Sequence, residues 1–391
     1  MIKRFIAVLL LASVLTPFVA SLADDFVIGY LEQRGDPRYG KKQTYAQYLT
    51  EPLGRPYSGA KVALEEVKFH GAAVNANFTL EKVRKRSAAE LLTAIDELQQ
   101  QGVNFFLVDA PADIVAELAE ATKGRDLMLF NVSAREDRLR QAQCQAHLLH
   151  IIPNYAMLND ALAQYLVSRK WTKVLALVGQ AEEDQHIAAA FERSAKRYGL
   201  KIVEQRSFVL SNDPRERDQN NISLLTAGAD YDVVFVADSD GEFAREVPFH
   251  TVLPRPVVGS EGLAAAAWHW AWERHGAPQL ENRFIDEAKR PMRDVDWAAW
   301  LAVKAIAEAV QRTASTDFAT LSEHILSPEV ILDGFKGNRL NFRPWDRQLR
   351  QPVLLITHNW VIDRAPIKGF LHQSNNMDTL GFDERDSSCK L

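Results

Sequence analysis

The sequence predicts an α/β protein that contains two mostly parallel sheets flanked by helices. Two observations lead to this fold class. From Phe26 onward, short apolar runs alternate with amphipathic helical patterns, the order that right-handed βαβ units produce. The chain also has 391 residues, which is enough for two hydrophobic cores rather than one. A composition of 47% hydrophobic and 25% charged residues is typical of a globular protein.

The first residues have the pattern of an export signal. A short basic start precedes the apolar stretch 5–14, and Ser21 and Ala23 put small residues at positions −3 and −1 of a cleavage site before Asp24. We expect residues 1–23 to be removed during export, the alternative being an uncleaved anchor. The net charge is −5, and no basic stripe with interleaved aromatics occurs, which argues against nucleic-acid binding.

Each strand is expected from an apolar run, and each helix from apolar residues at helical spacing. The expected strands are 26–31, 103–108, 126–130, 173–178, 231–238 and 255–260. The expected helices are 57–71, 87–102, 113–124, 155–170 and 184–199. Ser87 and Glu90 form a capping box for the second helix, and Asp113 is expected to cap the third.

The C-terminal third has a different pattern. Helical patterns continue from 261 to about 326, and 339–360 then predicts a hairpin around a Pro-Trp-Asp turn. Trp297 and Trp300, three residues apart, are expected in the core. For the alternating tryptophans, core packing or a contact between lobes is favoured over an aromatic cage; these are Trp268, Trp270 and Trp272.

The order of these segments resembles that of the type I periplasmic binding proteins, the branched-chain amino-acid group of ABC-transporter solute receptors. The stretch "LMLFNVSA" resembles the strand that ends in the family's Ser-Ala ligand loop, and "PVVGSEGL" resembles a later strand. The resemblance covers most of the mature chain, and its other segments are 57–67, 88–108, 231–238 and 296–317.

A narrower resemblance is to the branch of that family associated with PQQ-dependent alcohol dehydrogenase systems. Its segments are 267–284, 334–355 and 369–382. Because PQQ dehydrogenases need calcium or a lanthanide, metal supply is one role that this resemblance implies.

The resemblance implies two lobes joined by crossover strands, with ligand bound in the cleft between them by hinge closure. It implies a periplasmic, monomeric receptor that presents its closed form to an inner-membrane ABC permease. No chemistry on the ligand is implied, so an enzyme is not expected. The expected divisions are the signal 1–23, lobe 1 as 24–148 plus 260–328, lobe 2 as 149–259 plus 329–370, and the tail 371–391.

The family's ligand contacts suggest the candidate site. Ser133 and Ala134 match the Ser-Ala loop, and Glu261 falls where relatives hold the ligand's ammonium group. Other positions depart from the family, which argues against a simple branched-chain amino acid as ligand. Arg135 replaces a threonine, and a Gly-Pro loop is replaced by "DAPAD" with Asp109 and Asp113. A Tyr-Gly is replaced by Glu183 and Asp184, and we expect at least one of these two side chains to face the cleft.

Acidic residues follow nearly every predicted strand. Hard cations such as calcium bind six or more oxygens, mostly from carboxylates, so a converging set would suit calcium or a lanthanide. The alternative is that these acids cap helices or stay in solvent. The run from Asp238 to Glu242 looks like a fragment of a calcium loop. The candidate ligands are Asp109, Asp113, Glu183, Asp184, Asp238, Asp240 and Glu261, with Asp238 also a candidate for the organic ligand.

Three hypotheses of function therefore stay open, with an enzyme as a remote fourth. The chain is a receptor for a small organic solute with an amine or carboxylate, a receptor for calcium or a lanthanide, or a non-transport sensor or assembly factor. The two cysteines, Cys144 and Cys389, are either bridged, which would tie the tail to the loop after Arg140, or two free thiols.

Overall fold

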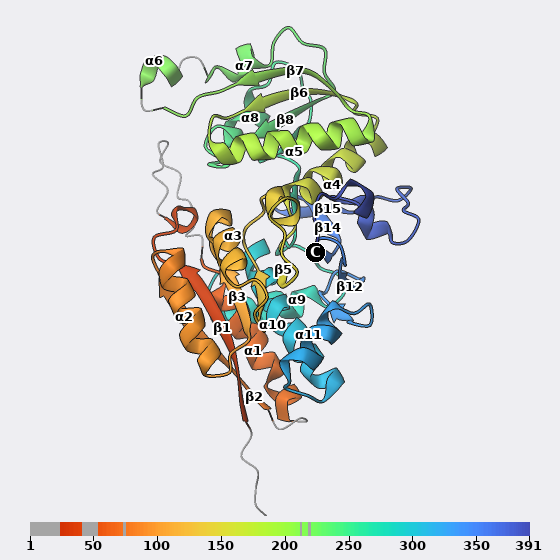
Figure 1. The fold of residues 1–391 in the computed structure, drawn as a ribbon. Helices are drawn as coiled ribbons and strands as arrows, with labels where there is room; N and C mark the ends of the chain where they lie inside the picture. The colour runs from red at the N-terminus through yellow and green to blue at the C-terminus, as the bar shows by residue number, and fades with distance from the viewer. Residues whose placement is uncertain (1–23, 41–53, 73–75, 212, 218–219) are drawn as a thin grey trace, which may run out of the picture.

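The computed structural model describes residues 24–40, 54–72, 76–211, 213–217 and 220–391. The predicted signal segment and its cleavage site lie outside these residues. The described chain forms two α/β lobes, one above the other in Figure 1, each built on a parallel sheet. No helix within the described residues is long and apolar enough to cross a membrane.

Lobe 1 is built on a five-stranded parallel sheet in the order β2-β1-β3-β4-β5. Its strands are β1 (Asp24–Gln33), β2 (Ala76–Lys85), β3 (Phe105–Asp109), β4 (Met128–Asn131) and β5 (Leu148–His150). One face packs on α2 (Ala88–Gln100) and α3 (Ala112–Ala121). The other face packs on α1 (Tyr57–Ala72), α9 (Ala277–Ala288), α10 (Asp294–Thr313) and α11 (Phe318–Leu326).

Lobe 2 is built on a four-stranded parallel sheet in the order β7-β6-β8-β9. Its strands are β6 (Lys173–Val178), β7 (Lys201–Ser207), β8 (Val233–Ala237) and β9 (Val257–Gly259). The helices α4 (Tyr155–Ser168) and α5 (Glu182–Tyr198) cover one face. The short helices α7 (Ile222–Leu225) and α8 (Val247–His250) cover the other, and α6 is Pro214–Arg217.

Two small antiparallel sheets lie near the junction of the lobes. One contains β10 (Ala264–Ala266), β14 (Val353–Thr357) and β15 (Trp360–Ala365), and the other β11 (Leu332–Asp333), β12 (Arg339–Phe342) and β13 (Leu349–Arg350). The chain passes between the lobes after β5, after β9 and after β13. Single turns of 3-10 helix complete the fold: η1 (Pro37–Tyr39), η2 (Asp137–Arg140), η4 (Ala244–Glu246), η5 (Asn376–Thr379) and η6 (Glu384–Asp386).

The crossovers are held together by buried polar side chains. Arg140, fully buried, donates to Ala134 O at 2.9 Å, to Ile152 O at 2.9 Å and to Gln348 Oε1 at 2.9 Å. Gln348 Nε2 in turn donates to the carbonyls of His150 and Ile152. The first and third crossovers therefore lie side by side and are joined by hydrogen bonds rather than by apolar packing alone.

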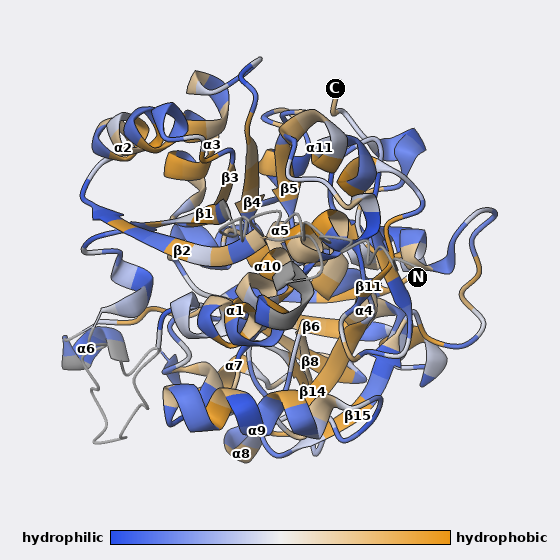
Figure 2. Ribbon diagram, turned by 90° about the horizontal axis from the view of Figure 1, so that it is seen from below, coloured by the Kyte–Doolittle hydropathy of each residue, from blue (hydrophilic) through white to orange (hydrophobic). Residues whose placement is uncertain are grey.

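Hydrophobic periodicity predicted the central elements correctly. The central strands β3, β6 and β8 are apolar along their length, as Figure 2 shows in orange, and Trp297 and Trp300 are buried on α10. Ser87 caps α2, because its Oγ accepts from Glu90 N at 3.3 Å. The Glu90 carboxylate accepts from Arg86 N rather than from Ser87 N, so the predicted box is one residue wider.

Two local predictions were wrong, and two strands were missed. Asp113 does not cap α3, whose N-cap is Pro111, so that Asp113 lies in the first turn. The tryptophan-rich stretch after β10 is not helical, and α9 begins only at Ala277. The strand β2 was not predicted, because its alternation is masked by basic residues on an exposed edge strand. The strand β7 was not predicted either, because every one of its residues is at least partly exposed.

The predicted hairpin forms, with β12 paired to β13 around Pro344–Asp346. The lobe boundaries proposed from the sequence stay a prediction. Leu332, Leu340 and Leu349 pack in the same hydrophobic cluster as α1 and α10. This packing favours placing 332–350 with lobe 1 rather than with lobe 2.

Candidate functional site

Asp109 ends β3 at the carboxyl edge of the lobe 1 sheet, where an α/β sheet binds its ligands. The side chain is fully buried. Its carboxylate accepts from Tyr39 Oη at 2.7 Å and from Arg55 Nη1 at 3.2 Å, and Arg38 Nη2 lies 3.5 Å away. Arg55 also stacks over the Tyr39 ring, with Cζ 4.4 Å from the ring centre. Two arginines therefore compensate the charge of Asp109.

The Ser-Ala loop follows β4 and is shaped by Asn131. Asn131 Oδ1 accepts from the backbone N–H groups of Ser133 at 3.2 Å and Ala134 at 2.9 Å, and Nδ2 donates to Ala134 O. These two N–H groups are therefore already used. The Ser133 side chain is 5% exposed, and its Oγ has no hydrogen-bond partner among the described residues. A buried hydroxyl without a partner is costly unless a ligand or water completes it.

Arg135 joins this loop to the opposite side of lobe 1. Its guanidinium donates to Pro153 O at 3.0 Å, in the first crossover, and to Asp294 Oδ2 at 2.5 Å, in the first turn of α10. Asp294 Oδ1 accepts from Trp268 N at 2.9 Å. The pair Arg135–Asp294 thus brings the Ser-Ala loop next to the start of α10.

Arg293 is the residue at the N-cap position of α10, next to Asp294, and its side chain makes no capping hydrogen bond. Four other arginines near this edge are paired with acids: Arg38 with Asp36, Arg55 with Asp109, Arg135 with Asp294 and Arg290 with Asp296. The Arg293 side chain makes no hydrogen bond or ion pair with any residue that the structure describes. It is accessible to solvent, yet surrounding atoms desolvate the guanidinium and lower its pKa, an effect that Asp294 and Asp296 oppose.

Asp184 lies at the corresponding edge of lobe 2, after β6. It is buried, and its carboxylate accepts from Ala181 N at 3.1 Å and from Ser239 N at 2.6 Å. The first bond caps α5, and the second holds the loop after β8. A Cβ at Gly179 would lie 2.1 Å from Asp184 Oδ2, so the glycine is needed for this close approach.

Asp238 has a similar role at the end of β8. Its carboxylate accepts from Asp240 N at 3.1 Å and from Ala244 N at 2.8 Å. Burial raises the pKa of Asp238, and those backbone N–H groups oppose the rise. Glu261, half-buried after β9, accepts from the N–H of the next residue, Gly262, at 3.0 Å. These acids bond to the backbone of their own loops.

Glu183 is the acid of this group that joins the first turns of α5 and α4, both of which belong to lobe 2. Its Oε1 accepts from Tyr155 Oη at 2.6 Å, and Tyr155 begins α4 directly after the first crossover. Burial raises the pKa of Tyr155, and the charges of Glu183 and Glu136 add to the rise while Arg135 lowers it. The Tyr155 hydroxyl therefore lies where α5 of lobe 2 meets the loop after β4. No hydrogen bond or ion pair among the described residues joins Glu183 to Glu261 or to 109–113.

The acids do not converge into a metal site within the described chain. Over the residues that the structure describes, no three His, Cys, Asp or Glu side chains are grouped so that they could hold a metal ion. The physical reason is that the candidates have other partners. Asp113, on the surface, pairs with Arg138; Asp109 pairs with arginines; and Asp184 and Asp238 accept backbone N–H groups.

Several residues of this site were not predicted from the sequence. The arginines Arg38, Arg55 and Arg293 and the phenol of Tyr39 were not singled out, although they surround or adjoin predicted residues. Arg38 and Tyr39 follow β1 at its carboxyl end, and that position was a usable signal. Arg293, by contrast, precedes a helix far along the chain, and only the tertiary structure brings it to the sheet.

Comparison with known proteins identifies the fold. No protein-family model matches the chain, and no curated protein matches it. Among solved structures, a branched-chain amino-acid ABC-transporter periplasmic ligand-binding protein from Burkholderia xenovorans has a TM-score of 0.72 at 12% identity, over 93% of this chain and 98% of its own. An ABC-transporter substrate-binding protein from Sphaerobacter thermophilus has a TM-score of 0.72 at 15% identity, over 92% and 100%.

A solute-binding protein of an ABC transporter from R. palustris, solved with benzoate, has a TM-score of 0.65 at 12% identity, over 94% of this chain and 99% of its own. Other similar structures were solved with leucine, isoleucine or 3,4-dihydroxybenzoic acid. Full coverage of both lobes at these scores shows that the chain has the two-lobed type I periplasmic-binding fold.

Proposed function

We propose that this protein is the solute receptor of an ABC transporter and that its ligand is a small organic acid. The ligand carboxylate binds at the edge of the lobe 1 sheet, between Ser133 and Arg293, and lobe 2 closes over it through the Tyr155–Glu183 pair. The protein performs no reaction on the ligand. It acts in the periplasm as a monomer and delivers the ligand to a membrane permease.

The observation that carries this proposal is the combination of an unpartnered buried hydroxyl and an unpaired cation. A hydroxyl donor and a guanidinium are groups that a carboxylate binds. Asn131 occupies the N–H groups of Ser133 and Ala134, so this loop offers the Ser133 hydroxyl rather than its backbone. Leucine, isoleucine, benzoate and 3,4-dihydroxybenzoic acid, the ligands of four similar structures, all carry a carboxylate, which supports the same ligand class.

The carboxylates of lobe 2 accept backbone N–H groups. This arrangement favours a ligand that is a carboxylic acid without an amino group. Relatives would use the acid at the position of Glu261 for an ammonium group, but here Glu261 accepts from Gly262 N, and the carboxylates of Asp184 and Asp238 also accept backbone N–H groups. We therefore expect benzoate-like or aliphatic acids to bind more tightly than leucine or isoleucine.

Calorimetric titration of the purified protein with benzoate, leucine, isoleucine and methyl benzoate tests the proposal. We expect the acids to bind and the ester not to bind, because the ester removes the negative charge. Changing Arg293 to Gln should weaken binding of the best acid at least about tenfold, which corresponds to about 1.4 kcal/mol. The control is Arg312→Gln, at the other, exposed end of α10. Equal binding of acid and ester, or an unchanged Kd in Arg293→Gln, would refute the proposal.

A narrower role, service to PQQ-dependent alcohol oxidation, rests on the sequence resemblance of three C-terminal segments. Deleting the gene and measuring PQQ-dehydrogenase activity during growth on an alcohol tests it. An unchanged activity contradicts that role and leaves the receptor proposal intact. No described contact favours calcium or lanthanide binding as a second function.

A further inference from the structure

The C-terminal tail, residues 371–391, is attached to both lobes. On lobe 2, the backbone of Gly381 is held from both sides, because its N–H donates to the buried Asp160 at 2.7 Å and its carbonyl accepts from Arg193 at 2.7 Å and from Arg197 at 2.6 Å. Leu380 is fully buried in the core that contains α4 and α5. Tail residues 379–381 are therefore part of lobe 2.

The same tail is attached to the β12–β13 hairpin, which packs with lobe 1. Asp378 is fully buried and accepts from Arg343 Nε at 2.8 Å and from Arg350 Nε at 2.9 Å. Arg343 also donates to the carbonyls of Met377 and Leu380. Asp378 therefore lies between the lobes, one residue before the part of the tail that belongs to lobe 2.

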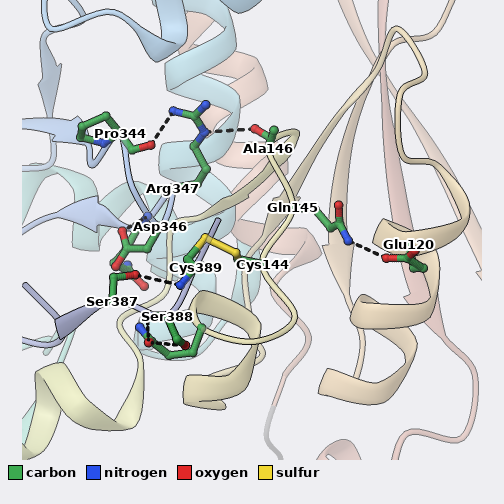
Figure 3. The surroundings of a disulfide bond; sticks show 12 residues. Glu120, Cys144, Gln145, Ala146, Pro344, Asp346, Arg347, Ser387, Ser388 and Cys389 are labelled. Carbon is green, nitrogen blue, oxygen red and sulfur yellow. Dashed lines mark hydrogen bonds between the residues drawn. A yellow bond between two sulfur atoms is a disulfide. The ribbon is translucent and has the colours of Figure 1, made fainter. Parts of the chain in front are cut away.

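The end of the tail returns to the main body of lobe 1. The structure contains the disulfide between Cys389 and Cys144, with Cα atoms 5.7 Å apart, which the sequence had left open (Figure 3). Cys144 lies in the loop between η2 and β5, the edge strand of the lobe 1 sheet. Beside the bridge, Ser388 N and Oγ both donate to Gln141 Oε1, at 2.8 and 3.0 Å.

We propose that this tail is an interlobe strap: a fourth connection, covalently closed by Cys144–Cys389, that restrains rotation of the lobes about the three crossovers. Lobe 2 holds the chain at Gly381 and Phe382, whose ring packs under Arg193. Lobe 1 holds it again at Cys389. Seven residue steps span at most about 25 Å when fully extended, so the strap sets an upper limit on how far these two points can separate.

The strap acts on the hinge rather than on the ligand site. Its contacts are with α4, α5, the β12–β13 hairpin and the loop before β5, and none of them is with Ser133 or Arg293. The hinge residue Gln348 follows Asp346 and Arg347, and Arg347 donates to Ala146 O beside Cys144. Opening the disulfide should therefore widen the range of lobe orientations without removing a ligand contact.

The test is a distance distribution between the lobes of the ligand-free full chain. Spin labels on non-canonical residues at the exposed positions Glu97 on α2 and Glu192 on α5 report that distance by pulsed electron resonance. With Cys144→Ser and Cys389→Ser together, we expect a broader distribution. Hydrogen exchange at 150–154 and 348–353 should become at least about threefold faster, because hinge opening becomes easier.

The control variant is Arg385→Gln, which loses only a bond to Gln373 within the tail. If the double variant does not fold, the oxidised protein is folded first and then treated with a reductant under native conditions. A distribution and exchange rates that match those of the disulfide-bonded protein would overturn the proposal. The experiment uses ligand-free protein, so a result that overturns the strap does not bear on the receptor proposal. A failure of the ligand-binding test likewise does not bear on the strap.

Discussion

The carboxyl edges of the two sheets use acidic residues in different ways. In lobe 1, acids are paired with arginine side chains from other elements, as Asp109 is with Arg55 and Asp294 is with Arg135. In lobe 2, acids accept from backbone N–H groups, as Asp184 does from Ser239 and Asp238 does from Ala244. One sequence signal, an acid after a strand, therefore corresponds to two structures.

The difference explains why the sequence suggested a cation as ligand and why we propose an anion instead. Backbone N–H groups satisfy the acids of lobe 2 without adding a formal charge. At the edge of lobe 1, the Arg293 side chain has no hydrogen bond or ion pair with any described residue. In the site that we propose, a ligand between these edges meets the Arg293 guanidinium on one side and acids that already accept hydrogen bonds on the other.

The largest effect is expected at Asp109. Changing it to Ala leaves Arg55 Nη1 and the Tyr39 hydroxyl without their buried acceptor, and removing one partner of a buried ion pair costs about 3–5 kcal/mol. Denaturant unfolding measures the change. Asp109→Asn, which keeps an acceptor but not the charge, should lose less. Equal stability of Asp109→Ala and the unmodified protein would show that lobe 1 does not depend on this pairing.

A smaller loss is expected at Asp184. Asp184→Ala leaves the N–H groups of Ala181 and Ser239 without an acceptor, at about 1–3 kcal/mol in total. Glu182→Ala, next to it but with a side chain that is 90% exposed, is the matched control and should be close to neutral. Thermal unfolding of both variants decides this. A loss in Glu182→Ala as large as in Asp184→Ala would mean that charge near the helix start, not hydrogen bonding, is what matters.

Asp137 gives a pH-dependent test at the junction of the two lobes. Burial raises the pKa of Asp137 from 3.8 to about 6, although its carboxylate accepts from Ala156 N at 3.1 Å. The folded state thus holds this proton more tightly than the unfolded state, so the contribution of Asp137 to stability falls as pH rises from about 4 to about 6.

Asp137→Asn keeps an acceptor for Ala156 and removes the titration. We expect it to be more stable than the unmodified protein at pH 8, by on the order of 1 kcal/mol after solvent screening, and no more stable below pH 4. Melting temperatures across this range provide the measurement. A difference that does not change with pH would contradict the shifted pKa of Asp137.

The smallest effect is expected at Asp113, the lobe 1 acid that pairs on the surface. Its side chain is 92% exposed, and its ion pair with Arg138 is of a kind that contributes about 0–1 kcal/mol. Asp113→Ala should therefore change stability little and leave benzoate binding unchanged. Weaker binding in this variant would place the residue at the ligand and revise the boundary of the site.

The sequence by itself determined the elements with strong local patterns. Apolar runs predicted β3, β6 and β8, helical periodicity predicted α2, α4 and α5, and Ser87 predicted a helix start. These signals succeed because burial and capping depend on residues a few positions apart. They fail for β2 and β7, where exposed polar residues hide the period of two, and for the tryptophan-rich stretch after β10.

Only the tertiary structure decided what the acids of the site contact. Asp109 was predicted from its position after a strand, but Tyr39 and Arg55 are 70 and 54 residues away from it. The same holds for Arg135 and Asp294, which are 159 residues apart, and for Cys144 and Cys389, at a separation of 245. A carboxylate has the same local signature whether it meets an arginine, a backbone N–H or a metal ion, and its partner is set by the packing of distant elements.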